Sequence, residues 1–168
     1  PATTTEPPPV DIEVKGDDGS QVNTVAANAI EDIQAFWKTE YPKVFKRPYR
    51  PVAGGFYAID SSTDPSGLPC AVDDITQVLN NAYYCPPDDA VVWDQQGLMP
   101  ELAKQYGDFT VAVVLAHEWG HAIQDRARIN EPTVVLELQA DCFAGAWVKH
   151  VRADRDTRFK LSTEDLDL

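Results

Sequence analysis

Several residue types are scarce in this chain, and each scarcity excludes a class of protein. Among its 168 residues are three histidines, three cysteines and one methionine. No apolar run approaches the ~20 residues that a membrane-spanning helix needs. Lysine and arginine together number 14 against 27 aspartates and glutamates, so the net charge is −13. Because proteins bind a phosphate backbone through a basic surface, we expect no nucleic-acid partner.

The rest of the composition suits one globular domain. Hydrophobic residues make up 43% of the chain and charged residues 24%, which are ordinary values for a soluble fold. A chain of this length can bury a substantial core. It opens at Pro1 and shows no signal peptide, so we expect a processed piece of a longer protein. No pattern in the sequence indicates an oligomeric state.

The three cysteines form no Cys-x-x-Cys pair, which argues against a cysteine-type zinc site. Cys70 and Cys85 flank a polar segment, whereas Cys142 lies in an apolar run. We therefore predict a Cys70–Cys85 disulfide and a free, buried Cys142; three reduced thiols in a cytosolic protein are the alternative. A disulfide implies an extracytoplasmic protein, either secreted or anchored to the cell envelope.

The two ends of the chain predict its domain boundaries. Residues 1–20 open with "PATTTEPPPV", a Pro/Thr-rich stretch without apolar periodicity, which predicts a disordered tether. Such a tether suits a membrane or cell-wall anchor outside this sequence, although a plain disordered terminus has the same composition. The folded domain is then residues 21–168. The final "LSTEDLDL" has the pattern of a helix start at Ser162 or Thr163, so we expect the domain to be truncated there.

Apolar spacing predicts helices and short strands along the chain. Helical spacing extends from Val22 to about Tyr41, where Pro42 should end the helix. A "PPDD" turn between two strand-like runs predicts a β-hairpin. The later predicted elements are strands at Gly55–Ile59, Ala82–Cys85 and Ala90–Asp94, and helices at Pro100–Tyr106, from Asp108 or Thr110 onward, and from Pro132 onward. The fold class is therefore α+β, with a small antiparallel or mixed sheet packed on one long helix and a following antiparallel helix.

The stretch "LAHEWGHAIQ" contains two of the three histidines. On an α-helix His117 and His121 lie on one face, one turn apart, and can direct ring nitrogens at one metal ion. Glu118 lies about 100° further round, so it can reach a water on that ion rather than the ion itself. Zinc lowers the pKa of such a water towards 7, and a carboxylate beside it can take the proton. This spacing is a signature of metallopeptidases.

A catalytic zinc site needs a third protein ligand. Ala127 occupies the position six residues after the second histidine, which excludes the class with a third histidine there. Asp125, one turn along the same helix, could reach the ion but would crowd the water. Glu137 in "ELQAD" is the better candidate, with Asp141 one turn later in an apolar helix where a lone carboxylate is costly. We expect Glu137 to bind zinc and Asp141 to accept the outer N–H of a ligand histidine, His117; a solvated acidic face is the alternative.

Other polar residues have weaker claims to the site. His150 lies about 220° round the helix from Glu137, which favours a surface histidine over a fourth ligand. Tyr83, Tyr84 and Tyr106 could each polarise a substrate carbonyl or stabilise its oxyanion, and the sequence does not choose among them.

Together these segments are similar to a known family. "HEWGHAIQ" followed by "LELQADCFAGAW", with "YYCP" and "VVWD" upstream, resembles the bacterial neutral zinc metallopeptidases over roughly Phe56–Trp147. The resemblance implies a zincin-like fold, one catalytic zinc ion and peptide-bond hydrolysis in or outside the cell envelope. The Glu-x-x-x-Asp half is similar to glutamate-ligand zincins such as the thermolysin-like enzymes. On that match the ligands are His117, His121 and Glu137, the base is Glu118, and Asp141 is the partner of a histidine. Ala122 departs from the histidine that many members carry there, but it faces away from the metal.

Two functions fit these patterns. The first is a zinc metalloendopeptidase in which Glu118 activates a zinc-bound water against a peptide or protein substrate. We expect Ala90–Trp93 to be the edge strand that holds the substrate backbone. The second is a zinc-stapled, catalytically silent binding module of the cell envelope. The acidic chain favours neutral or basic substrates.

Overall fold

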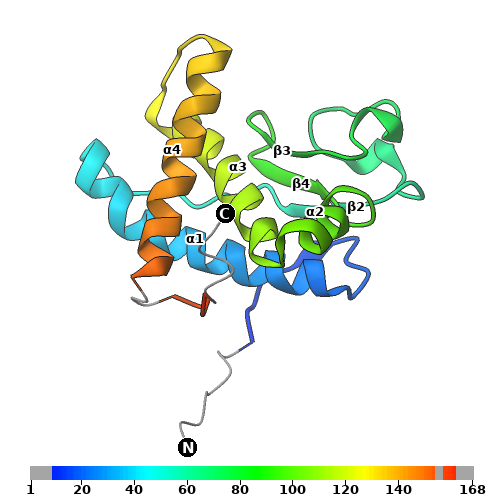
Figure 1. Ribbon diagram of the computed structural model, residues 1–168. Helices are drawn as coiled ribbons and strands as arrows, with labels where there is room; N and C mark the ends of the chain where they lie inside the picture. Colours follow the sequence, from blue (N-terminus) through cyan, green and yellow to red (C-terminus); the bar gives the residue numbers. More distant parts are fainter. Residues whose placement is uncertain (1–8, 154–156, 162–168) are drawn as a thin grey trace, which may run out of the picture.

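The computed structural model describes residues 9–153 and 157–161 (Figure 1). It has an α+β fold with a small mixed sheet, as predicted. The elements in chain order are β1 (Val14–Lys15), α1 (Gln21–Phe45), β2 (Phe56–Ile59), two 3₁₀ turns (Pro65–Gly67 and Ile75–Gln77), β3 (Ala82–Cys85), β4 (Ala90–Asp94), α2 (Leu98–Tyr106), α3 (Phe109–Ala127) and α4 (Thr133–Arg152).

The sheet has the strand order β1-β2-β4-β3, in which only the β3–β4 pair is antiparallel. The predicted hairpin is present, with Tyr84 opposite Val91. The expectation that Ala90–Trp93 forms the edge strand is wrong, because β4 lies between β2 and β3. Every residue of β4 is buried, as its run of apolar side chains requires in a strand with neighbours on both sides. On this side of the sheet the edge strand is β3.

The N-terminal segment contributes to the sheet. Val14 and Lys15 form β1 and pair with Phe56 and Tyr57 of β2. The prediction of a disordered tether over residues 1–20 is therefore wrong for these two residues. Gly16 turns the chain after β1 with a φ of +81°, and a Cβ there would lie 2.4 Å from the Ala58 carbonyl oxygen. This close approach needs glycine. Residues 1–8, like the helix start expected at residues 162–168, lie outside the described residues.

Helix α1 continues past the proline that was expected to end it. Pro42 lies inside the helix, which runs to Phe45 and closes with the Lys46 N–H donating to the Pro42 carbonyl. The buried ring of Tyr41 packs against Phe45 and Tyr49, with ring centroids 4.6 and 5.9 Å away. This packing holds the last turn together although the proline removes one backbone donor.

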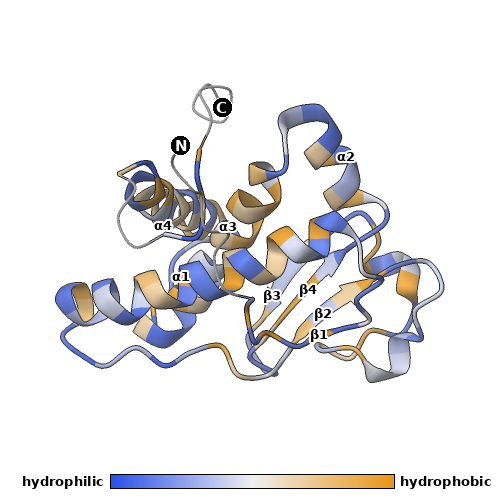
Figure 2. Ribbon diagram, turned by 90° about the horizontal axis from the view of Figure 1, so that it is seen from below, coloured by the Kyte–Doolittle hydropathy of each residue, from blue (hydrophilic) through white to orange (hydrophobic). Residues whose placement is uncertain are grey.

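Helix α3 is the centre of the molecule. It packs against α1, α2, α4 and β3, and in Figure 1 the sheet and α4 lie on opposite sides of it. Figure 2 shows that both α3 and the neighbouring strand β4 contain hydrophobic residues, many of which are buried. Gly120 permits α4 to approach closely, because a Cβ on it would lie 2.7 Å from the Ala140 Cα. No described helix is long and apolar enough to cross a membrane.

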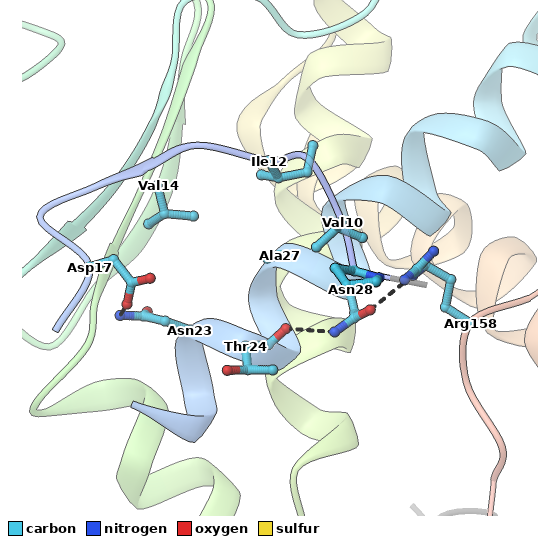
Figure 3. A pocket seen from close by; sticks show the side chains of 10 residues that line it. Val10, Ile12, Val14, Asp17, Asn23, Thr24, Ala27, Asn28 and Arg158 are labelled. Carbon is cyan, nitrogen blue, oxygen red and sulfur yellow. Dashed lines mark hydrogen bonds between the residues drawn. The ribbon is translucent and has the colours of Figure 1, made fainter. Parts of the chain in front are cut away.

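Polar contacts connect α1 to α4 and to the C-terminal end of the described chain. Asp32 of α1 is 3% exposed. It accepts hydrogen bonds from the Trp147 indole at 2.9 Å and from the Arg158 backbone N–H at 2.9 Å. Arg158 also donates to Asn28, beside a cavity of about 650 Å³ between α1 and the N-terminal segment (Figure 3).

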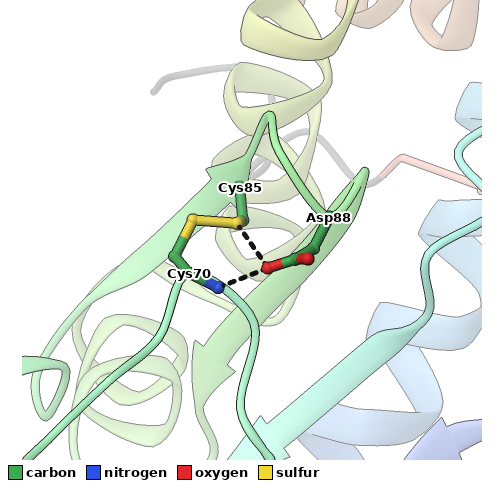
Figure 4. Close-up of side chains that lie close together, drawn as sticks. All are labelled: Cys70, Cys85 and Asp88. Carbon is green, nitrogen blue, oxygen red and sulfur yellow. Dashed lines mark hydrogen bonds between the residues drawn. A yellow bond between two sulfur atoms is a disulfide. The ribbon is translucent and has the colours of Figure 1, made fainter.

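The predicted disulfide joins Cys70 to Cys85 at the end of β3, with Cα atoms 5.8 Å apart (Figure 4). Asp88 accepts a hydrogen bond from the Cys70 backbone N–H at 2.7 Å. The loop before β3 is thereby attached to the edge strand. The prediction of a buried Cys142 is wrong, because its thiol is exposed. Helix α4 buries the side that carries Ala140 and Ala144, and Cys142 faces away from it.

Candidate metal centre

Helix α3 presents His117 and His121 on one face beside the gap to α4. Their rings lie edge to face with centroids 4.9 Å apart, and their Nε2 atoms are 3.2 Å apart. The preceding apolar turns of α3, which include Leu115 and Ala116, are buried. This burial fixes the rotation of the helix, so that the two histidines point into the gap.

Helix α4 brings Glu137 to the same point. Its Oε2 lies 3.2 Å from His117 Nε2, and its Oε1 lies 3.3 Å from His121 Nε2. Zinc bonds of 2.0–2.1 Å place neighbouring atoms of a tetrahedron roughly 3.3 Å apart. The spacing of this donor set is therefore that of a tetrahedral metal site. Of the two groups of possible metal ligands in the described part of the chain, the other contains the disulfide cysteines.

The outer nitrogens of both histidines meet oxygen acceptors. His117 Nδ1 lies 2.8 Å from Asp141 Oδ1, and His121 Nδ1 lies 3.0 Å from Gln124 Oε1. The orientation of the Gln124 amide is fixed by its other hydrogen bond. Its Nε2 donates to the Leu136 carbonyl at 2.7 Å, and a carbonyl oxygen can only accept, so exchanging the amide N and O would lose this bond. Both Nδ1 atoms are therefore donors, and in the neutral rings both Nε2 lone pairs face each other and the Glu137 carboxylate. A bound cation resolves this repulsion, so the residues fit a metal ion.

The sequence reasoning did not assign a role to Gln124, which is 4% exposed. It follows His121 by three residues on the same helix, so the two side chains are neighbours. A buried amide in an otherwise apolar helix needs hydrogen-bond partners, and that was the available signal. The orientation of the amide depends on the Leu136 carbonyl of α4, which the sequence of α3 does not reveal.

A comparison with known families identifies the chain. A sequence profile of the family described as "Putative neutral zinc metallopeptidase" matches residues 19–167. The chain belongs to this family. It is 35% identical over 89 residues to the uncharacterized protein YpfJ of Escherichia coli K12. The matched region covers 42% of this chain and 31% of YpfJ.

A second relative is the uncharacterized protein Rv2575 of Mycobacterium tuberculosis H37Rv, which is 35% identical over 79 residues. That match covers 39% of this chain and 27% of Rv2575. The chain thus spans less than a third of the length of these two relatives. No solved structure matches it.

In this member of the metallopeptidase family, Glu118 lies behind the two histidines. It is 8% exposed, and its Oε2 accepts a hydrogen bond from the Tyr84 backbone N–H at 2.9 Å. Burial raises the pKa of Glu118 to about 7, against the opposing effects of the His117 charge and of the Tyr84 N–H. Glu118, the three possible ligands and the edge strand β3 all line one cavity of about 580 Å³.

The alternative ligands have other contacts. Asp125 lines the same cavity, but its Oδ2 lies 3.4 Å from the Tyr84 hydroxyl and 3.9 Å from Arg50. It does not belong to the group of converging ligand atoms found in the described residues. His150 lies against Phe36, with ring centroids 5.3 Å apart, and is likewise outside that group.

The three tyrosines proposed as carbonyl-polarising groups use their hydroxyls elsewhere. The Tyr84 hydroxyl donates to Asp89 at 2.8 Å, and the Tyr83 hydroxyl donates to the Pro69 carbonyl at 3.5 Å. The Tyr106 hydroxyl accepts from the neighbouring Gln105 side chain, and the Tyr106 side chain is half exposed. Only the backbone of Tyr84 reaches Glu118.

Proposed function

We propose that this chain is the catalytic domain of a zinc metallopeptidase that hydrolyses peptide bonds. The ligands are His117, His121 and Glu137, and the general base is Glu118. One observation carries the proposal: three donor atoms converge at tetrahedral spacing while both outer histidine nitrogens donate to fixed acceptors. Membership of the neutral zinc metallopeptidase family supports the choice of zinc.

The residues of the site have separate roles in orienting the ligands and transferring a proton. Asp141 and Gln124 hold the two imidazoles with their Nε2 atoms directed inward. When bound, zinc supplies a Lewis acid that polarises the substrate carbonyl and makes a water more acidic. Glu118 accepts a proton from the attacking water and passes it to the leaving amine. A buried carboxyl that lines the same cavity as the three ligands is placed to accept this proton and release it again.

Strand β3 is the proposed docking edge for the substrate. It is the outer strand next to the site, and Ala82, Tyr83 and Tyr84 line the cavity. An extended peptide can pair with such an edge through backbone hydrogen bonds, which bind many sequences alike. The partner is therefore an unfolded or extended segment of a peptide or protein.

The Cys70–Cys85 disulfide supports an extracytoplasmic location, because such bonds persist in oxidising compartments. We propose a protein that is secreted or anchored to the cell envelope. The disulfide attaches the loop before β3 to the docking edge. An oxidising compartment, which preserves the disulfide, therefore also preserves this attachment.

A zinc-stapled module without turnover is the second candidate. The side chains of Glu137 and Asp141 are 51% and 68% exposed, which leaves one wall of the site open to solvent. The chain also spans less than a third of YpfJ and of Rv2575. An open site can hold an ion without enclosing a substrate.

Cleavage of an unstructured protein separates these two functions. Wild type and Glu118→Gln are compared after both are shown to hold one equivalent of zinc. The peptidase proposal expects cleavage by wild type and a loss of at least about 100-fold in Glu118→Gln. Equal inertness of the two zinc-loaded proteins would favour the silent module. Absence of zinc from protein purified without chelators would refute both.

A further inference from the structure

A third cavity, of about 250 Å³, lies beside the metal-site cavity where the ends of α1 and α3 meet. We call it the arginine cavity. Asp125 lines both cavities, so the two adjoin at this residue. The residues that line the arginine cavity are Tyr41, Arg47, Pro48, Arg50, Asp125, Arg126 and Arg128.

The charge of this cavity differs in sign from that of the chain. The chain carries 14 basic and 27 acidic residues, yet four of the seven residues that line the cavity are arginines. Arg126 is buried and paired with Asp89 at 2.8 Å. Arg50 has one long contact, 3.9 Å from Asp125. Arg47 and Arg128 are exposed, and no carboxylate of the described residues is within salt-bridge distance of either.

The negative ends of the two helices do not neutralise the positive charge of the four arginines. A helix C-terminus carries about half a negative charge, so the ends of α1 and α3 together offset about one positive charge. Asp89 and Asp125 offset two more of the four guanidinium groups. The cavity therefore keeps a net positive charge of about one, within a chain whose net charge is −13.

The backbone at both helix ends carries basic side chains where glycine is the usual residue. Lys46 caps α1 with a φ of 58°, and Arg128 caps α3 with a φ of 56°. The left-handed region is unfavourable for residues with a Cβ, and glycine would occupy it without that cost. Arg128 thus lines the cavity at a cost in backbone energy, whereas Lys46 donates from its Nζ to the Lys43 carbonyl and is not part of the lining.

We propose that the arginine cavity binds a carboxylate of the peptide substrate, beside the bond that is cleaved. The inference rests on the proposed peptidase function and adds a substrate class to it. Guanidinium groups bind carboxylates through paired N–H···O contacts. Strand β3 lines the metal-site cavity, and that cavity adjoins the arginine cavity at Asp125. A peptide that docks on β3 and extends past Asp125 would place an acidic group among Arg47, Arg50 and Arg128. The local charge selects acidic substrates although the net charge favours neutral or basic ones.

The test measures binding to the zinc-loaded Glu118→Gln protein, which removes turnover. Labelled peptides of one length carry either glutamate or glutamine on each side of a central apolar residue. A further pair ends in a free carboxylate or an amide, which distinguishes a side chain from a chain end as the source of the carboxylate. The second protein adds Arg47→Gln, Arg50→Gln and Arg128→Gln. Arg126 stays unchanged because it is buried. The control protein instead adds changes at three exposed basic residues elsewhere, namely Lys104→Gln, Lys149→Gln and Arg152→Gln.

We expect the arginine variant to bind a carboxylate-bearing peptide on the order of tenfold more weakly than its parent, with the matched neutral peptide unchanged. The control triple variant should lose less than about twofold, because it changes only the net charge. Equal losses in the two triple variants would overturn the proposal. So would equal affinity of the parent for acidic and neutral peptides, or no measurable binding of either. If the parent prefers the acidic peptide while wild type cleaves nothing, the cavity assignment stands and the peptidase function fails.

Discussion

The contact between Gln124 and His121 gives the sharpest prediction about the metal site. Gln124→Leu keeps the approximate volume of the side chain but removes the acceptor for His121 Nδ1 and the donor to the Leu136 carbonyl. The imidazole then loses the group that fixes its tautomer and its rotation. Loss of such a partner weakens metal binding by about 10- to 100-fold, or roughly 1.4–2.7 kcal/mol. Gln124→Glu, which keeps the acceptor but loses the donor, should fall between wild type and Gln124→Leu.

Competition with a chelator of known zinc affinity, at one fixed pH, measures the effect. The absorption spectrum of the cobalt-substituted protein reports the ligand geometry independently of activity. Gln139→Leu is the matched control, because Gln139 contacts the Gln124 amide at 3.1 Å but does not contact His121. We expect it to change zinc affinity by less than about threefold. Wild-type affinity together with an unchanged cobalt spectrum in Gln124→Leu would refute the role assigned to this amide.

Three further predictions concern stability. Gly120→Ala places a Cβ 2.7 Å from the Ala140 Cα, and should cost about 1–3 kcal/mol in a thermal melt; Gly145→Ala, in open space on α4, should be neutral or stabilising, and equal effects would contradict the packing argument. Replacing Cys70 and Cys85 by serine opens a loop with a sequence separation of 15 and should lower the free energy of unfolding by about 3 kcal/mol under oxidising conditions. If the replacement has the same effect under oxidising and reducing conditions, the disulfide does not form. Removal of zinc by a chelator should lower the melting temperature by about 5–10 °C, reversed by added zinc, since a ligand at 100 times its Kd stabilises by about 2.7 kcal/mol; an unchanged melt would argue against a bound ion.

The elements that the sequence predicted well are those with local signals. The apolar first half of α3 and the turn between β3 and β4 are signals carried by neighbouring residues, and both elements are present. The spacing of His117 and His121 is likewise local. Glu137 was predicted on the premise that the apolar run around it is buried. That premise is wrong, because the Glu137 side chain is 51% exposed and Val134, Val135 and Leu138 are exposed as well. The structure nevertheless brings Glu137 to both histidines.

The wrong predictions concern properties that depend on distant segments. Strand order is one: the run Ala90–Trp93 cannot reveal that β2 pairs with it on its other side. Pro42 ends an isolated helix, but the rings of Tyr41 and Phe45 hold the last turn of α1 together. Cys142 lies in an apolar stretch, yet the described residues cover only one side of α4. The roles of Gln124 and of the arginines beside Asp125 depend on contacts between helices.

Hydrogen exchange of the Tyr84 amide, which donates to Glu118, can report on the state of the site. Amides that point away from the sheet on an edge strand normally exchange their protons with solvent quickly, since nothing protects them. The Tyr84 amide faces the buried carboxylate of Glu118 at 2.9 Å, so its exchange is slow only while that side chain stays in place. One backbone resonance therefore reports how often the proposed base leaves its position. A docked peptide that competes for this N–H would appear in the same signal, without any substrate being cleaved.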